Sequence, residues 1–418
     1  MHCSFRLASL LQPPVPSLQP QSGEGAGMAT ELAYAMITPY SLHKSRTGGI
    51  IGRLVSLSKL DLVGVHMYAP SDKWVDEYLD LLKRSDLGNP VRGQFIEYVD
   101  QNLRRNNPLG LSNRCMILLF RGENALNHLM DDVVGHASPK VTGHTVRGTY
   151  GDFQITSDGR VKYFEPAVIC GPDPETVREE LAFFARTAAG DGGIVEDSIR
   201  LPPDARNVQT ELVILKPENF EKRSRKPGNI IDVFSRTGLY IVGAKILSMT
   251  AAQGEAFYGP LLAIFREKLQ GNVEAVLRQK LRGAFDFELP EEFYKAGRTT
   301  LAEANARTEF AKIVQYMTGV DIRKIKDEAE KNKPGPVRCL ALLYRGEDAI
   351  QKIRYWLGAT NPEKAESGTV RSDFGRDLMR NAAHASDSPE NARREREIIG
   401  MWKPDPKSEF KRIIEEAL

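Results

Sequence analysis

The chain has 418 residues, which at roughly 100–200 residues per domain predicts two or three domains. Apolar residues make up 41% and charged residues 27%, a composition typical of globular proteins. The formal net charge of +2 is too close to balance to indicate a nucleic-acid or membrane partner, and no apolar run approaches the ~20 residues needed to span a bilayer.

Cysteine usage bounds the chemistry further. The four cysteines, Cys3, Cys115, Cys170 and Cys339, are widely scattered and include no CxxC pair, which argues against a zinc site. So few cysteines are typical of a reducing compartment. We therefore expect a cytoplasmic protein without a direct metal site.

The first segment, 1–28, is rich in Pro, Gln, Ser and Gly, as in "LQPPVPSLQPQSGEGAG". Such a composition buries little apolar surface, so we expect a disordered tail. The apolar piece "LASLL" is too short for a convincing signal peptide.

An internal repeat organises the remaining chain. "RCMILLFRGENAL" (114–126) recurs as "RCLALLYRGEDAI" (338–350), and "ELAYAMITP" (31–39) resembles "ELVILKP" (211–217). Repeats at this scale indicate duplicated structural units. We expect one domain over 29–200, a Pro-containing linker over 201–208 and a second domain over 209–418.

The second copy shows the expected elements most clearly. A strand at 212–215 precedes a helix, "NIIDVFSRTG", that Gly238 ends, and a β-rich stretch, "LYIVGAKILSM", follows. The repeat offset then grows from 178 to 224, which predicts an insertion of about 46 residues near 260–306. Another strand, "RCLALLYRG", a helix, a loop and a last strand ahead of His384 complete the order βαββαβ. We therefore predict an α+β protein of two tandem ferredoxin-like domains, each with an antiparallel sheet and helices packed on it.

His384 is the only histidine in the last 274 residues. Ser388 is a favourable N-cap and Pro389 suits a first helical position, so we expect a helix to begin there. His384 would precede a helix N-terminus, where phosphate binds favourably, and neutral imidazole is a competent phosphoryl acceptor. The alternative is a histidine that only satisfies a turn.

The motifs around His384 resemble the nucleoside diphosphate kinase family. The residues concerned are "NAAHASD" (381–387), "LGATNPEKAESGTVRSDFG" (357–375), which is similar to a phosphate-binding loop and the strand after it, "VILKPENF" (213–220) and "FYGPL" (257–261). The resemblance covers most of 209–418 and is strong over 337–402. It implies transfer of the γ-phosphate of ATP to nucleoside diphosphates by a ping-pong mechanism, with Mg²⁺ carried by the nucleotide phosphates, and a homo-oligomer.

The resemblance also implies roles around the imidazole. His384 would be the phosphorylated nucleophile, and Glu395 would orient its ring. Tyr258 and Ser386 would line the pocket of the histidine.

The remaining implied roles concern the nucleotide. Lys216 and Arg371 would hold the transferring phosphate, with Arg354 and Thr360 on the other phosphates. Asn381 would reach the sugar hydroxyls. Arg binds phosphate through a planar fork and Lys through a point charge, which suits a reaction that depends on positioning.

Two positions depart from the family pattern. The glycine expected after the nucleophile is Ala385, and the aromatic residue that stacks on the base is expected near Glu309. Either Phe310 takes over this stacking by a shift of one residue, or stacking on the base is weakened. Together with the insertion, these departures leave open a second interpretation, a non-catalytic nucleotide-binding or scaffold protein built from two degenerate kinase-like domains.

The first copy lacks most of these residues. Its alignment puts Thr38 at the lysine position, Ala167 at the asparagine position and Cys170 at the nucleophile position. We expect a degenerate domain with a structural role, which takes the place of a neighbouring subunit. A cysteine hydrolase centred on Cys170 is the third interpretation, although no His–Asn/Asp partnership is visible.

Overall fold

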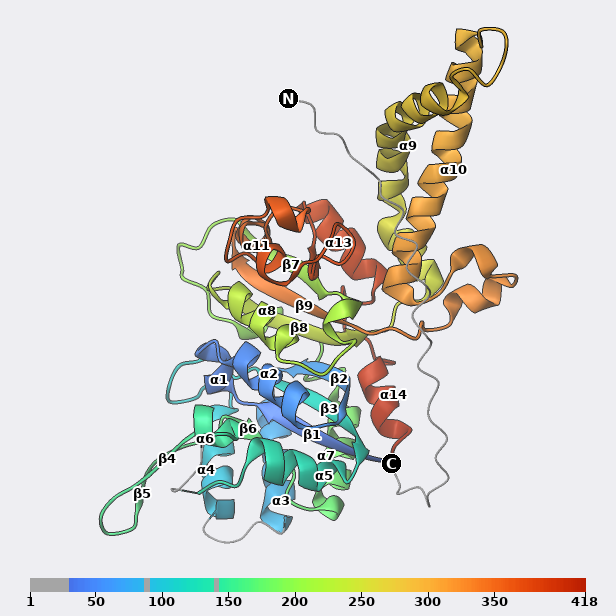
Figure 1. Ribbon diagram of the computed structural model, residues 1–418. Coiled ribbons are helices and arrows are strands. Elements are labelled where there is room, and N and C mark those ends of the chain that lie inside the picture. The colour runs from blue at the N-terminus through green and yellow to red at the C-terminus, as the bar shows by residue number, and fades with distance from the viewer. Residues whose placement is uncertain (1–29, 86–90, 139–142) are drawn as a thin grey trace.

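The computed structural model describes residues 30–85, 91–138 and 143–418, except for the side chains of 269, 270 and 272. The tail predicted over 1–28 lies outside the described residues. Two four-stranded antiparallel sheets form the body of the molecule, and helices cover them (Figure 1). Within the described part of the chain, no helix is both long enough and apolar enough to cross a membrane.

The first half folds around the sheet of order β2-β3-β1-β6. Its strands carry continuous buried apolar runs, such as Ala33–Ile37, because helices cover them. Its elements are β1 (Thr30–Ile37), α1 (Pro39–His43), α2 (Thr47–Leu57), β2 (Asp61–Tyr68), α3 (Asp72–Arg84), α4 (Val91–Asn102), β3 (Cys115–Glu123), α5 (Ala125–Asn127), η1 (His128–Val134), α6 (Val146–Tyr150), β4 (Asp152–Ile155), β5 (Val161–Glu165), β6 (Val168–Ile169), α7 (Pro174–Thr187) and η2 (Glu196–Ser198).

The second half contains a sheet of order β8-β9-β7-β10, so corresponding strands occupy corresponding places in the two sheets. Its elements are β7 (Val208–Leu215), η3 (Pro217–Asn219), α8 (Lys226–Ser235), β8 (Tyr240–Leu247), α9 (Ala251–Leu281), α10 (Glu291–Thr318), η4 (Ile322–Lys324), η5 (Glu328–Asn332), β9 (Cys339–Glu347), α11 (Ala349–Leu357), η6 (Pro362–Lys364), α12 (Val370–Phe374), β10 (Ala383–Ala385), α13 (Pro389–Ile398) and α14 (Glu409–Glu415).

Local sequence signals explain several boundaries. The Ser388 side chain accepts a hydrogen bond from the backbone N–H of Asn391 at 3.1 Å, and α13 begins at Pro389, as predicted. The chain turns after α8 at Gly238, whose φ of 70° suits glycine. Two expectations were wrong: the segment after the phosphate-binding loop forms helix α12 and no strand, and the last strand, β10, contains His384.

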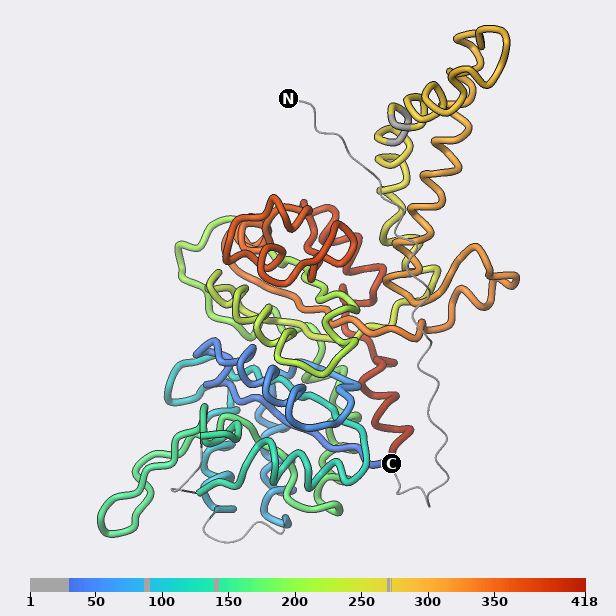
Figure 2. The backbone as a smooth tube through the Cα atoms, in the orientation of Figure 1, coloured from blue at the N-terminus to red at the C-terminus, as the bar shows by residue number. Residues whose placement is uncertain are grey.

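Helices α9 and α10 form a long hairpin that stands away from the body of the molecule (Figure 2). They contain 31 and 28 residues, whereas α3 and α4 at the corresponding place in the first half contain 13 and 12. Ion pairs join the two helices, Arg266 with Glu303 at 2.5 Å and Arg278 with Glu291 at 2.6 Å. The extra length of the second half therefore lies largely in this hairpin, which begins beside His384.

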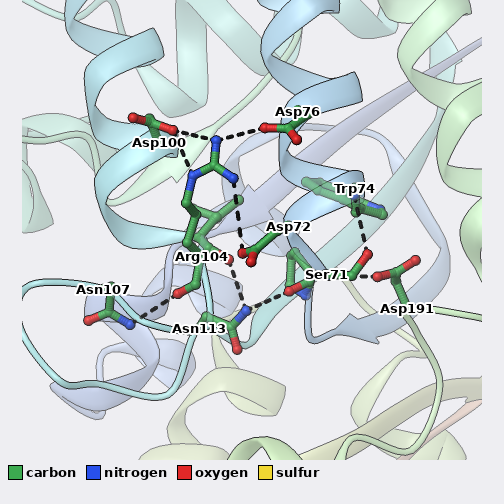
Figure 3. A network of polar contacts seen from close by, with 11 residues as sticks. Ser71, Asp72, Trp74, Asp76, Asp100, Arg104, Asn107, Asn113 and Asp191 are labelled. Carbon is green, nitrogen blue, oxygen red and sulfur yellow. Dashed lines mark hydrogen bonds and ion pairs between the residues drawn. The ribbon is translucent and has the colours of Figure 1, made fainter.

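In the first half, helices α3 and α4 are short and tied together. Arg104 bridges Asp76 on α3 and Asp100 on α4, each at 2.7 Å, and reaches Asp72 at 4.0 Å (Figure 3). A network of several charges holds its geometry better than one exposed pair. The two short helices are thereby fixed to each other.

The C-terminal helix α14 crosses back to the first half, where it packs on α7 and β2 (Figure 1). Phe410 of α14 stacks on the buried His66 of β2 with ring centroids 4.7 Å apart. The halves are therefore joined by a shared apolar contact as well as by the chain.

Candidate active site

His384 lies at the centre of β10, which pairs with the end of β7. His384 is opposite Ile214, and Ala383 is opposite Leu215. The backbone N–H of Lys216 donates to the carbonyl of Ala382 at 3.0 Å. Ala382 has a φ of 69°, a strained value for a residue with a side chain. This bend brings the imidazole strand beside Lys216.

One nitrogen of the imidazole has a fixed partner. The Nε2 atom of His384 lies 2.7 Å from Oε2 of Glu395, and the Ser386 hydroxyl donates to the same oxygen at 2.8 Å. Glu395 is 5% exposed. An ionised carboxylate only accepts hydrogen bonds, so the neutral ring carries its proton on Nε2 and leaves a lone pair on Nδ1. Within the described ranges, Nδ1 makes no hydrogen bond.

Two aromatic rings near the start of α9 contact the imidazole. Phe257 and Tyr258 contact it edge-on, with ring centroids 5.1 Å and 6.3 Å away. Tyr258 is 7% exposed, and its hydroxyl has no hydrogen-bond partner within the described structure. Burial raises the pKa of this hydroxyl well above its ordinary value. Tyr258 is therefore a neutral donor that faces the site without a partner.

Lys216 is a half-buried cation of the site. Its Nζ donates to Asn381 Oδ1 at 2.7 Å and to the carbonyl of Met379 at 2.9 Å. Burial lowers the pKa of Lys216 to about 8, with the charge of Arg371 acting in the same direction and that of Glu218 opposing it. An anionic ligand would offset the cost of burying this charge, so the site favours a negatively charged ligand.

Arg371 of α12 reaches the back of β10. Its guanidinium donates to the carbonyls of Gly358 at 3.1 Å and Ala383 at 3.3 Å. Its Nε is buried without a hydrogen-bond partner in the described part of the chain. Burial first, and then the charge of Arg354, lower the pKa of Arg371 to about 10. A bound anion would therefore stabilise Arg371 as well.

The remaining polar residues lie at the rim and the floor of the candidate site. Arg354 on α11 and Thr360 are exposed, and the Thr360 hydroxyl accepts from Arg371 at 3.4 Å. Asn381 is 2% exposed and donates to the carbonyl of Thr360 at 3.0 Å. The phosphate-binding loop, Arg371 and the strand of His384 are thus joined by hydrogen bonds.

Phe310 does not match its predicted role. It is 9% exposed and belongs to the apolar core under α10, so its ring offers no free face to a base. Glu309 is engaged with Lys312 at 2.7 Å. The burial of Phe310 argues against the expected stacking on the base.

Sequence reasoning missed three contributors. Phe257 was within the quoted motif "FYGPL", but only its tyrosine was singled out. Glu218 accepts from the backbone N–H of Ala382 at 2.9 Å and from the hydroxyl of Tyr316, and so supports the strained turn before β10. Arg394 contacts both Glu395 and α9. An arginine next to a glutamate carries no spacing signal that could have identified it.

The charged groups fit a polyphosphate better than a bare metal ion. Within the ranges that the structure describes, no three His, Cys, Asp or Glu side chains converge as a metal site. Of the carboxylates at hand, Glu395 and Glu218 are occupied by His384, Ser386, Tyr316 and a backbone N–H, and Glu211 is fully buried within β7. A divalent cation would therefore be held by the phosphates of a ligand, with Lys216 and Arg371 on the same phosphates.

The corresponding place in the first half carries different side chains. Thr38 donates its backbone N–H to Ala167, as Lys216 does to Ala382, and Ile37 pairs with Val168 as Leu215 does with Ala383. The counterpart of His384 is consequently Ile169. Cys170 lies one residue further, which corrects the predicted alignment.

A pocket of about 250 Å³ remains there, lined by Met130, Arg147, Ile169 and Cys170 among others. Each of the three guanidinium nitrogens of Arg147 donates to protein atoms, namely to Gly135, Val168 and Cys170. Burial raises the pKa of the Cys170 thiol, which makes it a poor nucleophile. The cysteine hydrolase interpretation therefore finds no support in this geometry.

Comparison with known proteins gives a consistent result. A sequence profile described as nucleoside diphosphate kinase matches residues 291–401. The nucleoside diphosphate kinase of Bdellovibrio bacteriovorus is 31% identical over 189 residues, 45% of this chain and 90% of that protein. That of Halorhodospira halophila is 30% identical over 198 residues, 47% of this chain and 95% of that protein. A solved structure of the Aquifex aeolicus enzyme is 25% identical, with a TM-score of 0.29, and covers 46% of this chain and 94% of its own.

Proposed function

Because the chain belongs to the nucleoside diphosphate kinase family, we propose that it transfers the γ-phosphoryl group of ATP to nucleoside diphosphates through a phosphohistidine at His384. One observation carries the proposal: Nε2 of His384 is held by Glu395 at 2.7 Å while Nδ1 makes no hydrogen bond in the described structure. A ring fixed in this tautomer has a lone pair ready for attack on phosphorus.

The proposed reaction has two half-reactions. The Nδ1 lone pair of His384 attacks the γ-phosphorus, the bond from phosphorus to the bridging oxygen breaks, and ADP leaves with that electron pair. The phosphorylated ring is then cationic, and its Nε2–H donates to the carboxylate of Glu395. A terminal phosphate oxygen of a nucleoside diphosphate attacks the same phosphorus, and His384 is restored. Ser386 keeps Glu395 in place throughout.

Charge around the ring would stabilise the transferring group. Lys216 and Arg371 are half-buried cations next to β10, and Arg354 and Thr360 lie at the rim for the other phosphates. Mg²⁺ carried by the nucleotide supplies charge neutralisation across the phosphates when bound. Asn381, whose amide is already engaged by Lys216, is proposed to reach the sugar. Tyr258 is proposed to donate its unpaired hydroxyl to the bound nucleotide phosphates.

The first test is direct. Purified protein incubated with γ-labelled ATP should acquire protein phosphate that is labile to acid and stable to base. His384→Ala should abolish both labelling and nucleotide exchange, and Cys170→Ala should leave both unchanged. Labelling that survives His384→Ala would refute the proposal. Complete absence of labelling in the unaltered chain would favour the non-catalytic scaffold, an interpretation supported by the burial of Phe310.

We also propose that the halves are tandem copies and that the first half acts as an internal partner subunit without activity of its own. Helices α2 and α8 pack together and β2 lies near β8. The contacts are reciprocal: Arg114 donates to the carbonyl of Ile241 at 3.1 Å, and Arg338 donates to that of Leu62 at 3.3 Å. The proposed limits are 29–200 and 209–418, and the expected homo-oligomer of whole chains stays a prediction.

The stoichiometry of labelling tests the silent first half. With Ile169 at the position of His384, phosphate should saturate at one per chain. Two phosphates per chain, mapped by mass spectrometry to both halves, would contradict it.

A further inference from the structure

Arg394 occupies a position between the imidazole pair and the root of the helical hairpin. Its NH2 lies 3.3 Å from Oε1 of Glu395, the carboxylate oxygen that does not contact His384. Its NH1 donates to the carbonyl of Ala256 at 3.2 Å, and its NH2 also approaches the carbonyl of Phe257 at 3.4 Å. One guanidinium thus touches α13, α9 and the partner of the nucleophile.

The contact with Ala256 has a cause in the sequence. In an α-helix, the carbonyl of Ala256 would accept the N–H of residue 260, but that residue is Pro260, which has no N–H. An unpaired carbonyl inside a helix costs free energy and marks a place where helices bend. Arg394 supplies the missing donor.

Pro260 lies where the hairpin meets the active site. Phe257 and Tyr258, which contact the imidazole, lie three and two residues before Pro260, and the projecting part of α9 follows it. A movement of the hairpin about Pro260 would therefore displace Arg394 and, through it, Glu395.

We propose that Arg394 is a positioning residue that couples the hairpin of α9 and α10 to the Glu395–His384 pair, so that the position of the hairpin regulates the nucleophile. The inference rests on the proposed phosphohistidine function for its physiological meaning. The contacts that connect Pro260 to the imidazole, through Arg394 and Glu395, do not depend on that function.

The neighbouring Arg393 provides a matched control. It has the same side chain on the same helix, pairs with Glu397 at 3.1 Å and lies over Trp402, and its side chain is 65% exposed. It makes no contact with Glu395 or α9 among the described residues. Arg393→Gln therefore removes the same charge from α13 without touching the link.

The first readout is the acylation of His384 by diethyl pyrocarbonate, which attacks neutral imidazole and needs no nucleotide. Around His384 stand Glu395 and Ser386 from the α13 side, Tyr258 from α9, and Lys216 and Arg371 from the phosphate side. Arg394→Gln leaves the Glu395 charge less compensated, which favours imidazolium. The pH midpoint of acylation should rise by about half a unit or more. Arg393→Gln should shift it much less.

The second readout is amide hydrogen exchange in the first turns of α9. Arg394→Gln should speed exchange over 251–262 by about tenfold, because a helix in which the Ala256 carbonyl has no donor opens more readily. Arg394→Lys should restore the acylation midpoint in part, because one ammonium keeps the charge, but should not restore exchange protection, since it cannot bridge both partners.

A double-mutant cycle completes the test. Pro260→Ala supplies the missing N–H to Ala256, so the effect of Arg394→Gln on exchange should shrink in that background. Equal behaviour of Arg394→Gln and Arg393→Gln in both readouts would overturn the inference. If the unaltered chain forms no phosphohistidine, the proposed function fails alone, because acylation and exchange still report on the link.

Discussion

At the scale of single residues, the site depends on groups that are costly to bury and that a phosphate would stabilise. Lys216 is held at a lowered pKa of about 8, mainly by burial. Arg371 is similarly destabilised by burial, and its Nε lacks a partner in the described structure. Both costs fall when an anion binds, so relief of these costs should contribute to the affinity for an anionic ligand.

Lys216 leads to a pH prediction. A lysine is charged below its pKa, so the rate of phosphoenzyme formation should fall as the pH rises through about 8, or somewhat higher once phosphate is bound. Single-turnover labelling from about pH 6 to about pH 10 measures this fall in the rate of phosphoenzyme formation. Lys216→Arg keeps the charge, so its lower rate should not fall over the same range. An alkaline limb that persists in Lys216→Arg would assign the effect to another group.

Glu180 of α7 is the counterpart of Glu395, but its neighbours are Tyr34 and Tyr78, and the position that corresponds to His384 holds Ile169. Burial raises the pKa of Glu180 to about 8. The folded state thus holds a proton that the unfolded state loses above about pH 4.5, so stability falls as the pH rises from there to about 8. Glu180→Gln should remove this loss, with a gain at pH 8 of roughly 3–5 kcal/mol as an upper bound. Urea unfolding at about pH 5 and about pH 8 measures it. Equal gains at both pH values would point to a packing effect.

At the scale of elements, the sequence predicted most helices and strands, because buried strands read as apolar runs and helices carry cap signals such as Ser388. It failed where few residues form an element. The ribbon of β4 and β5 has mostly exposed side chains and no apolar run to announce it. The register of β6 depends on the backbone turn at Ala167, which no sequence pattern indicates. The predicted alignment was therefore wrong by one residue and put Cys170 at the position that Ile169 occupies.

The sequence also predicted a part of the candidate site. The motifs brought Lys216, Arg371 and His384 into one neighbourhood, because separated motifs met at adjoining strand ends. The burial of Phe310 and the contacts of Arg394 depend on how α9 and α10 pack, and long-range packing leaves no local mark in the sequence.

Helix α14 gives an element-scale prediction. Phe410 is 4% exposed between the halves, so Phe410→Ala should cost about 3–5 kcal/mol of unfolding free energy, as large truncations in a core do. Glu415→Ala, on the exposed side of α14, should change it by less than about 0.5 kcal/mol, because among the described residues Glu415 forms an ion pair only with Lys411. Urea titration measures both. A Phe410→Ala cost near that of Glu415→Ala would show that α14 contributes little to cohesion.

At the scale of the whole molecule, the halves meet through a close crossing of α2 and α8. A Cβ atom added to Gly228 would lie 2.2 Å from the carbonyl oxygen of Gly48 and 2.6 Å from the backbone nitrogen of Gly52. Neither backbone group can move without shifting its helix. The absence of a side chain at Gly228 therefore sets how near the halves approach.

Gly228→Ala should consequently lower the unfolding free energy by about 1–3 kcal/mol and loosen the interface. Gly271→Ala, in the hairpin with nothing within 4 Å of the added atom, should be neutral or stabilising by about 0.5–1 kcal/mol. Thermal unfolding with hydrogen exchange over α2 and α8 measures both. A stabilising Gly228→Ala would mean that the halves are held less closely than the crossing indicates.

The return of α14 to the first half has a consequence for biosynthesis. The surface of β2 around His66 receives Phe410 from a helix more than 300 residues later in the chain. The first half thus emerges from the ribosome with an apolar strip exposed and cannot close it during its own translation. The docking of α14 should therefore wait until synthesis has passed Glu415.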